Sequence, residues 1–182
     1  MVKIITIIGS RETPPDILAR MRRIAKYCAR NGIVVRSGKA GGADAAAIYG
    51  CMDADFDGYI TQSATPEMYI PWSGFGEGGM TNKWDINLGD SLEAEAIAKS
   101  IHPAWERCSQ GAKRLHSRNV GQILGRDLNT PTDLVLYWCK EKFGKPTGGT
   151  ATAVNLGTSK GCATLNMLHE GWNIKLKELI GN

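Results

Sequence analysis

The sequence predicts a doubly wound α/β protein, with a Rossmann-like, mostly parallel sheet, helices on both faces and a helical and loop insertion after the third strand. Short β-rich apolar runs alternate with segments of helical periodicity, which favours parallel strands joined by right-handed crossovers. The first apolar run ends in a glycine turn before a proline-led helix. With 182 residues and 42% hydrophobic content, the chain suffices for one sizeable core. We therefore expect a single Rossmann-like domain over residues 1–182.

The first half of the chain has the pattern of a βαβ unit followed by a further helix and strand. Lys3–Ile8 is a continuous apolar run and is the expected first strand. Apolar residues recur at helical spacing over Pro14–Asn31, and a glycine follows this segment. Ile33–Arg36 is the expected second strand, and the turn Gly38–Gly42 leads into a helix of small residues. A third short strand is expected between Gly58 and Pro71.

Residues 72–130 are predicted to form an insertion or lid between the third strand and the rest of the core. The segment opens with the glycine-rich stretch "WSGFGEGGM" and continues with helical patterns at about Ser91–Ser100 and Leu115–Leu128. The core resumes with a strand at Asp133–Cys139. It is completed by a helix at about Gly149–Lys160, a short strand at Cys162–Leu165 and a terminal helix.

The composition of the chain indicates where in the cell the protein is expected and what role its cysteines have. The apolar runs are far shorter than the roughly 20 residues needed to cross a bilayer, and the opening residues read as a strand instead of a leader. We therefore expect a cytoplasmic protein with no membrane partner. The cysteines are odd in number and form no close CxxC pair, a pattern typical of neither a disulfide framework nor a zinc site. We expect reduced packing residues, no metal and no cofactor. The five cysteines are Cys28, Cys51, Cys108, Cys139 and Cys162.

Positive charge is concentrated between Lys99 and Arg126, although the net charge of the chain is only +4. Within this segment Glu106 is the single interior acid. Two interpretations stay open: a solvated helix face, or a surface that meets phosphates. The basic residues are Lys99, Arg107, Lys113, Arg114, Arg118 and Arg126.

Two glycine turns, Gly9-Ser10-Arg11 and Gly148-Gly149-Thr150, each stand between a predicted strand and a predicted helix. In a doubly wound sheet these two strand ends meet where the strand order reverses, which is where ligands bind. Glycines let the backbone approach an anion, and exposed N–H groups with the helix dipole favour its negative charge. Arg11 can add a charge-assisted contact. The candidate phosphate-binding and nucleotide-binding residues are Gly9, Ser10, Arg11, Gly38, Gly41, Gly42, Gly148, Gly149, Thr150 and Thr152.

Several carboxylates are candidates for chemistry or sugar binding. Asp44 lies in the first turn of a helix, where the dipole alone favours an acid. Its functional interpretation is a carboxylate at the pocket edge that holds ribose hydroxyls or acts in acid–base catalysis. Glu93 is the second candidate catalytic residue, and Glu95 lies beside it on the same predicted helix.

Aromatic and polar residues of the insertion are candidates for covering the ligand. Trp72, Phe75 and Trp84 stand in or beside the glycine-rich stretch, where a base-stacking lid is expected. Arg118 and Asn119, with His116 and Gln122, fall within two helical turns and either close over the ligand or pair with neighbouring elements. Trp105 and Trp138 are assigned to the core.

The stretches "IIGSRETP", "VVRSGKAGGADAAA" and "GGTATAVNLGTSKGCATLN" resemble the DprA/Lonely-Guy (SLOG) superfamily of Rossmann-like nucleotide-binding proteins. The middle, "IHPAW" and "LHSRNVGQILGRDLNTPTDLVLYW", is similar to small DprA-like proteins of bacteriophage genomes. The resemblance covers nearly the whole chain. It implies a nucleotide-binding protein of phage origin in the host cytoplasm, and by family analogy a homodimer.

The resemblance leaves three functions open. A protein that sequesters or senses a nucleotide needs only the phosphate turns. An N-glycosidase of nucleoside 5′-monophosphates, as in the Lonely-Guy branch, uses a glutamate soon after the phosphate loop, whereas this chain continues Ala151-Thr152-Ala153. A DprA-like accessory would bind single-stranded DNA, and would need the Lys99–Arg126 charges to form a continuous track.

Overall fold

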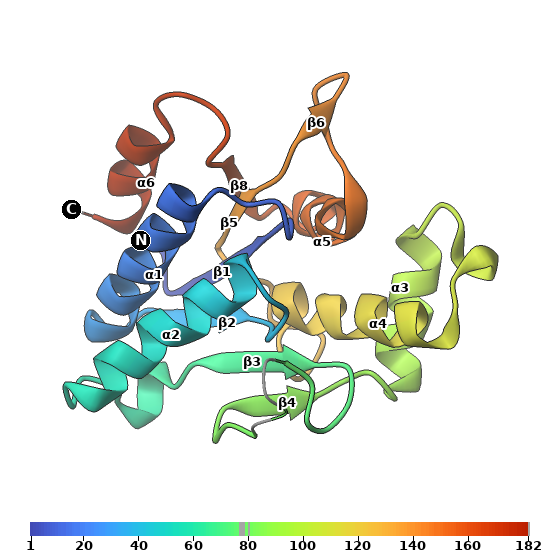
Figure 1. The fold of residues 1–182 in the computed structure, drawn as a ribbon, viewed down its shortest axis with the longest axis horizontal. Helices are drawn as coiled ribbons and strands as arrows, with labels where there is room; N and C mark the ends of the chain where they lie inside the picture. The colour runs from blue at the N-terminus through green and yellow to red at the C-terminus, as the bar shows by residue number, and fades with distance from the viewer. Residues whose placement is uncertain (77–78, 80, 182) are drawn as a thin grey trace.

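The computed structural model describes residues 1–76, 79 and 81–181 and confirms the Rossmann-like class (Figure 1). Within this part of the chain, a sheet of six parallel strands runs in the order β4-β3-β2-β1-β5-β8. The order reverses between β1 and β5, as expected for a doubly wound sheet. The strands are β1 Ile4–Gly9, β2 Val34–Ser37, β3 Glu67–Ile70, β4 Asp85–Asn87, β5 Leu134–Trp138 and β8 Ala163–Asn166.

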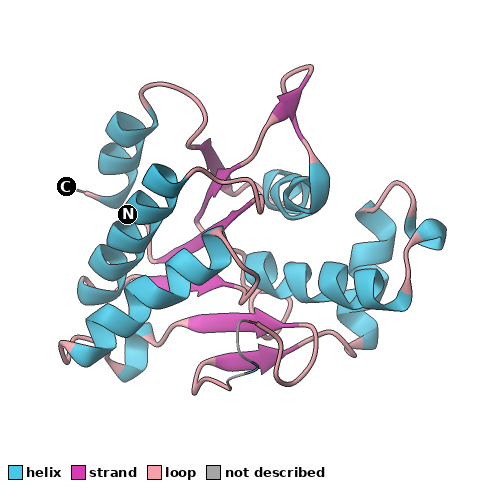
Figure 2. Ribbon diagram, viewed as in Figure 1, coloured by secondary structure: helices cyan, strands magenta, loops and turns pink. Residues whose placement is uncertain are grey.

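Helices cover both faces of the sheet (Figure 2). On one face lie α1 and α2, with α6 beside β8, and on the other lie α4 and α5, with α3 packed against α4. The helices are α1 Pro15–Arg30, α2 Ala43–Phe56, α3 Leu92–Ile101, α4 Gln110–Leu124, α5 Gly148–Ser159 and α6 Trp172–Ile180, with 3-10 turns η1 Gln62–Ala64 and η3 Trp105–Arg107. The structure holds no described helix that is long and apolar enough to span a membrane.

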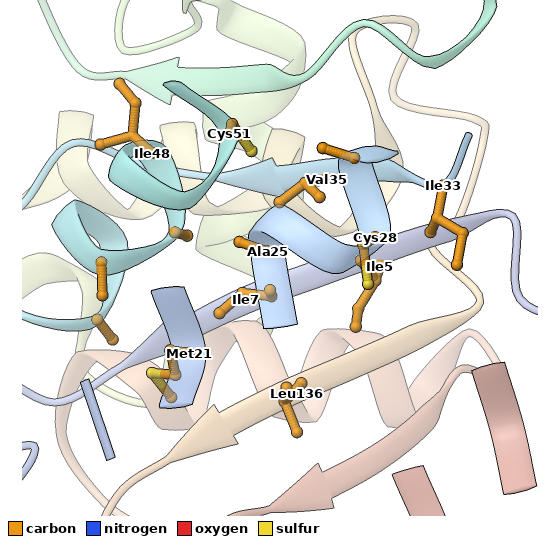
Figure 3. Packing of buried hydrophobic residues seen from close by; sticks show 14 of the residues in the cluster. Ile5, Ile7, Met21, Ala25, Cys28, Ile33, Val35, Ile48, Cys51 and Leu136 are labelled. Atoms are coloured by element: carbon orange, nitrogen blue, oxygen red, sulfur yellow. The ribbon is translucent and has the colours of Figure 1, made fainter. Parts of the chain in front are cut away.

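Alternating strand residues supply two cores, one on each side of the sheet. Ile5 and Ile7 of β1 point into the core beneath α1 and α2, which Figure 3 shows with Leu136 of β5. Ile8 of β1 and Tyr137 of β5 belong to the core beneath α4 and α5. Burial on both faces explains why the strands read as continuous apolar runs.

Strand β4 was not predicted, and it changes the account of the insertion. Asp85–Asn87 pairs in parallel with β3 inside the segment 72–130, so this segment contributes a strand to the sheet. Trp84, assigned from sequence to a base-stacking lid, is instead 4% exposed and packs in the core beneath α1 and α2. The lid assignment of Trp84 was wrong because the residue immediately precedes an unrecognised strand. Trp105 and Trp138 are buried as expected.

Two further differences lie near the carboxyl ends of the strands. Helix α4 begins at Gln110, five residues before the expected start, because the Ser109 hydroxyl accepts a hydrogen bond from Ala112 N–H at 3.2 Å and caps the helix. A hairpin, β6 Glu141–Lys142 and β7 Lys145–Pro146, links β5 to α5 and projects from the body of the molecule (Figure 1).

Candidate functional site

A pocket of about 380 Å³ lies at the carboxyl ends of β1 and β5, where the strand order reverses. Both predicted glycine turns line it. Its other walls are Gly41 with Asp44, at the start of α2, and one face of α4. The residues of that face are His116, Arg118, Asn119 and Gln122. The structure therefore brings together residues that stand more than 130 positions apart in the sequence.

The turn after β1 is fixed against the end of β5. Ser10 N–H donates to the carbonyl of Trp138 at 2.9 Å, and the Thr13 hydroxyl donates to the carbonyl of Ser10 at 2.6 Å. Gly9 is required here, because an added Cβ would lie 2.8 Å from Ala43 Cβ and 3.0 Å from the Trp138 carbonyl. Backbone of β1, α2 and β5 can therefore meet closely at the pocket.

The N-terminus of α5 forms the opposite wall and carries donors that no side chain caps. The hydroxyl of the N-cap residue Thr147 donates to the carbonyl of Lys140 at 2.8 Å instead of capping the helix. Gly148 has φ +71°, and open space surrounds the Cβ positions of Gly148 and Gly149. No acidic residue occupies the first turn. Free N–H groups at the positive end of a helix dipole make this wall suitable for an anion.

Arg11 places a positive charge at the pocket. Its side chain is exposed, and it forms no ion pair with any residue that the structure describes. The neighbouring Glu12, which sequence reasoning did not single out, also lines the pocket and pairs with Lys140 at 2.7 Å. The charge of Glu12 is thus matched within the protein, whereas that of Arg11 is available to a ligand.

Asp44 and Arg118 form a buried ion pair in the pocket wall. Arg118 Nη1 lies 3.1 Å from Asp44 Oδ2, and both side chains are less than a tenth exposed. Burial raises the pKa of the Asp44 carboxyl above its usual value, and the Arg118 guanidinium opposes part of this rise. Gly38, predicted to bind phosphate, does not line the pocket; a Cβ there would overlap Arg118 Nη1 and Asp44 Oδ2. Its role in the structure is to make room for the ion pair.

The α4 face of the pocket carries polar atoms that lack hydrogen-bond partners. Arg118 Nε, Gln122 Nε2 and His116 Nδ1 are buried and bond to no described residue. Burial, together with the charges of His102 and Arg118, lowers the pKa of His116 to about 4, so its imidazole is neutral at pH 7. Buried polar atoms of this kind are ordinarily paired, and a polar ligand in the pocket can satisfy them.

Trp72 and Phe75 line a second hollow, of about 490 Å³, that adjoins the first. The two hollows share Arg11, Ala40 and Gly41 in their linings. The rings of Trp72 and Phe75 lie edge to face at 5.2 Å, and Arg118 Cζ lies 5.9 Å from the Phe75 ring. Residues 77, 78 and 80 of the expected lid lie outside the described residues.

An ion pair that sequence reasoning missed joins the turn before α2 to strand β4. Lys39 Nζ lies 2.8 Å from Asp85 Oδ2, and both side chains are about 10% exposed. Asn82 N–H donates to the same carboxylate oxygen at 2.9 Å. Only β4 brings Asp85 beside the start of α2, so the pairing had no signal in the sequence.

Other predicted residues lie away from the pocket. Glu93 is exposed on α3, where Glu95 also lies, and neither lines the pocket. Thr152 is buried inside α5, and Gly42, with φ +87°, is the N-cap of α2 without lining the pocket. Gly9, Ser10, Arg11, Gly41, Gly148, Gly149 and Thr150, with Asp44, Arg118 and Asn119, do line it.

Half of the basic residues in the Lys99–Arg126 segment are already paired with acids. Three of its six basic residues are engaged in ion pairs: Lys99 with Glu106, Arg114 with Asp90, and Arg118 with Asp44. Arg118 is also buried.

The parallel sheet defines a Rossmann-like α/β protein, and its pocket lies at the strand-order reversal, which is where sheets of this class usually bind ligands. Residues 1–61 match the family model described as DNA recombination-mediator protein A, which confirms the resemblance to the DprA/Lonely-Guy superfamily. The match spans β1 to α2, about a third of the chain. No curated protein matched the sequence.

Proposed function

We propose that this protein binds a nucleotide or nucleotide derivative in the switch-point pocket, as a sequestering, sensing or processing protein. The observation that carries the proposal is that both glycine turns and Arg11 line one cavity. Together with the adjoining hollow, its size falls within the range of small-molecule sites, roughly 300–1,000 Å³.

The phosphate is proposed to lie between Gly9-Ser10-Arg11 and Gly148-Gly149-Thr150. The uncapped N-terminus of α5 offers backbone donors, and Arg11 offers a guanidinium with no ion pair among the described residues. Thr150 lines the pocket beside these donors and can add a hydroxyl. This set is suited to an anion and contains no acid in the first turn of α5 to repel one.

The proposed position of the phosphate also determines where the sugar and the base of the nucleotide would lie. Asp44, Asn119 and Gln122 line the same pocket and offer polar groups for sugar hydroxyls. The base is proposed to lie in the adjoining hollow, beneath Trp72 and Phe75, because aromatic faces stack with bases. Arg11 lines both hollows, so one ligand can extend from the first to the second.

The positions of the carboxylates favour binding over hydrolysis. An N-glycosidase needs a carboxylate near the bond between base and sugar. Glu93 lies away from the pocket, Asp44 is held by Arg118 and Glu12 by Lys140. We therefore place the glycosidase alternative second to ligand binding.

Binding of single-stranded DNA is the other candidate, and two observations favour it. The matched family is named for DNA recombination. In addition, the β6–β7 hairpin carries Phe143, which is 92% exposed, between Lys142 and Lys145. An exposed aromatic ring interleaved with basic residues is typical of proteins that stack bases and follow a phosphate backbone. Three of the six basic residues between Lys99 and Arg126 are paired with acids, which argues against a long DNA track on α3 and α4.

Native mass spectrometry of protein purified without added ligand tests the proposal first, because a retained small molecule identifies the ligand by mass. Calorimetry with nucleoside 5′-monophosphates and the matching nucleosides is the second step. We expect the monophosphate to bind at least about tenfold more tightly, since a charged hydrogen bond contributes about 1.5–3 kcal/mol. Equal affinity for both, or binding of neither, would contradict a phosphate site between the two turns.

A further inference from the structure

A cluster of two imidazoles and a thiol lies beside the pocket. His102, Cys108 and His116 each offer one metal-ligating atom, and these atoms all lie within 4.8 Å of one another. Cys108 Sγ is 3.9 Å from both ring nitrogens of His102, and the rings of His102 and His116 are 4.3 Å apart between centroids. Each of the three residues is partly buried.

The chain between α3 and α4 is folded to produce this cluster. His102 is the C-cap of α3, Cys108 follows the 3-10 turn η3, and His116 lies on the second turn of α4. Trp105 of η3 is buried and lies against both imidazoles, at 6.1 Å from His102 and 6.4 Å from His116 between ring centroids. The tryptophan thus anchors the turn that brings the three residues together.

The distances suit a tetrahedral ion. Zn²⁺ bound to nitrogen and thiolate sulfur at their usual bond lengths separates those two atoms by about 3.6 Å. The observed 3.9 Å between Cys108 Sγ and each His102 nitrogen is close to that value, and the imidazole must turn so that one nitrogen faces an ion held by the thiolate. His116 Nδ1 is buried and has no partner among the described residues. Ala104 N–H donates to His102 Nδ1 at 3.2 Å, and a metal bound at that nitrogen would replace this hydrogen bond.

We propose that His102, Cys108 and His116 bind one Zn²⁺-like divalent cation beside the nucleotide pocket. Nitrogen and sulfur donors without a carboxylate select Zn²⁺ over Mg²⁺ or Ca²⁺. On binding, the Cys108 thiol loses its proton to solvent and a metal–sulfur bond forms without any change of oxidation state. Three protein ligands leave one tetrahedral position for water or a solute. His116 also lines the pocket, so the ion would belong to the pocket wall.

Co²⁺ titration of protein without a histidine tag tests the site directly. A tetrahedral Co²⁺–thiolate centre gives visible ligand-field bands and a near-ultraviolet sulfur-to-metal band, and we expect both to saturate at one ion per chain. The variants Cys108→Ser and His102→Ala should lose the site, with affinity falling at least about tenfold. The matched controls are Cys162→Ser, a half-buried thiol outside the cluster, and His169→Ala, the third histidine of the chain; both should bind as the unmodified protein does.

A second measurement keeps the proposal falsifiable if a variant folds poorly. In the unmodified protein, Zn²⁺ should slow iodoacetamide alkylation of Cys108 and leave that of Cys162 unchanged, as peptide mapping would show. Zn²⁺ should also raise the Tm of the unmodified protein and not that of Cys108→Ser. Equal protection of both thiols, no sulfur-to-Co²⁺ band, or unchanged affinity in a folded Cys108→Ser protein would overturn the proposal. The assay needs no nucleotide, so its outcome is independent of the proposed function.

Discussion

Gly38, Asp44 and Arg118 depend on one another at the scale of single residues. The ion pair lies at the start of α2 against α4, and Gly38 leaves space for it where any side chain would overlap the two charged groups. Removing one partner of a buried pair leaves an uncompensated charge, which costs more than the pair itself contributes. The glycine of the "SGKAGG" stretch is therefore explained by packing around a charge, although sequence alone suggested a phosphate contact.

Replacing Arg118 with Met should destabilise the protein by about 3–5 kcal/mol, because the Asp44 carboxylate would stay buried without its partner. Burial already raises the pKa of Asp44, and loss of the guanidinium raises it further. A carboxyl whose folded pKa exceeds its unfolded value stabilises the fold below the unfolded pKa, about 4, and this stability is lost as the pH rises through the folded pKa.

Urea unfolding at several pH values measures this effect. The loss in Arg118→Met should be smallest in acid, and the double variant Arg118→Met/Asp44→Asn should recover part of it at neutral pH. A single variant as stable as the unmodified protein at pH 7 would show that the pair is not buried in solution.

Arg11 carries the clearest prediction for the pocket. Arg11→Ala should weaken binding of a nucleoside 5′-monophosphate by roughly tenfold to a hundredfold, because a charge-assisted hydrogen bond to phosphate is lost. The exposed Arg23 of α1 lies outside the pocket, and Arg23→Ala serves as the matched control. Calorimetry gives both affinities. If the two variants bind equally well, the phosphate lies elsewhere.

Much of the arrangement of elements was predictable from sequence, because the central strands are buried on both faces and read as apolar runs. Strand β4 could not be predicted, because it consists of only three residues of mixed polarity at the edge of the sheet. The site followed the same pattern. Glycine turns have a sequence signal, whereas the Lys39–Asp85 and Asp44–Arg118 pairs arise only when separate elements pack together. The cluster around Cys108 had no CxxC signal in the sequence, because the residues beside this cysteine in the structure are two histidines.

Helix α5 allows a prediction at the scale of the element, because its first half lines the pocket and its second half does not. Thr150 lines the pocket, and Thr150→Val keeps the shape of its side chain while removing the hydroxyl, so phosphate binding should weaken by roughly tenfold or more. Thr158, near the other end of the helix, donates to the Val154 carbonyl, and Thr158→Val should leave binding unchanged. Equal loss in both variants would point to an effect on the helix instead of the ligand.

Helices α1 and α2 cross closely at Gly50. A Cβ there would overlap the Arg22 carbonyl and lie 2.8 Å from Ala25 Cβ, so Gly50→Ala should destabilise the fold by about 1–3 kcal/mol. Gly111 of α4 faces open space, and Gly111→Ala should instead stabilise by about 0.5–1 kcal/mol through better helix propensity. Chemical denaturation measures the free energy of unfolding of both variants. If Gly111→Ala is less stable than the unmodified protein and Gly50→Ala is equally stable, the packing argument is wrong.

At the scale of the whole molecule, salt dependence separates a small ligand from a polymer. Each DNA phosphate neutralised in a single strand contributes a slope of about 0.7 to the fall of affinity with salt. We expect a shallow slope and competition by mononucleotide, because three of the six basic residues between Lys99 and Arg126 are already paired. Fluorescence anisotropy with a labelled oligonucleotide measures both. A steep, uncompeted response that Phe143→Ala abolishes would instead favour DNA binding at the hairpin.

One wall of the pocket lies within the segment that matches the family model, and the other lies outside it. Gly9–Arg11 and Asp44 lie within the segment that matches the recombination-mediator family, whereas the α4 face, the start of α5 and the Trp72–Phe75 loop all lie beyond residue 61. Substitutions in the second wall can therefore change which molecule the pocket prefers while the first 61 residues keep their family signature. The family match thus covers one wall of the pocket, and proteins that share this match are free to differ in the other wall.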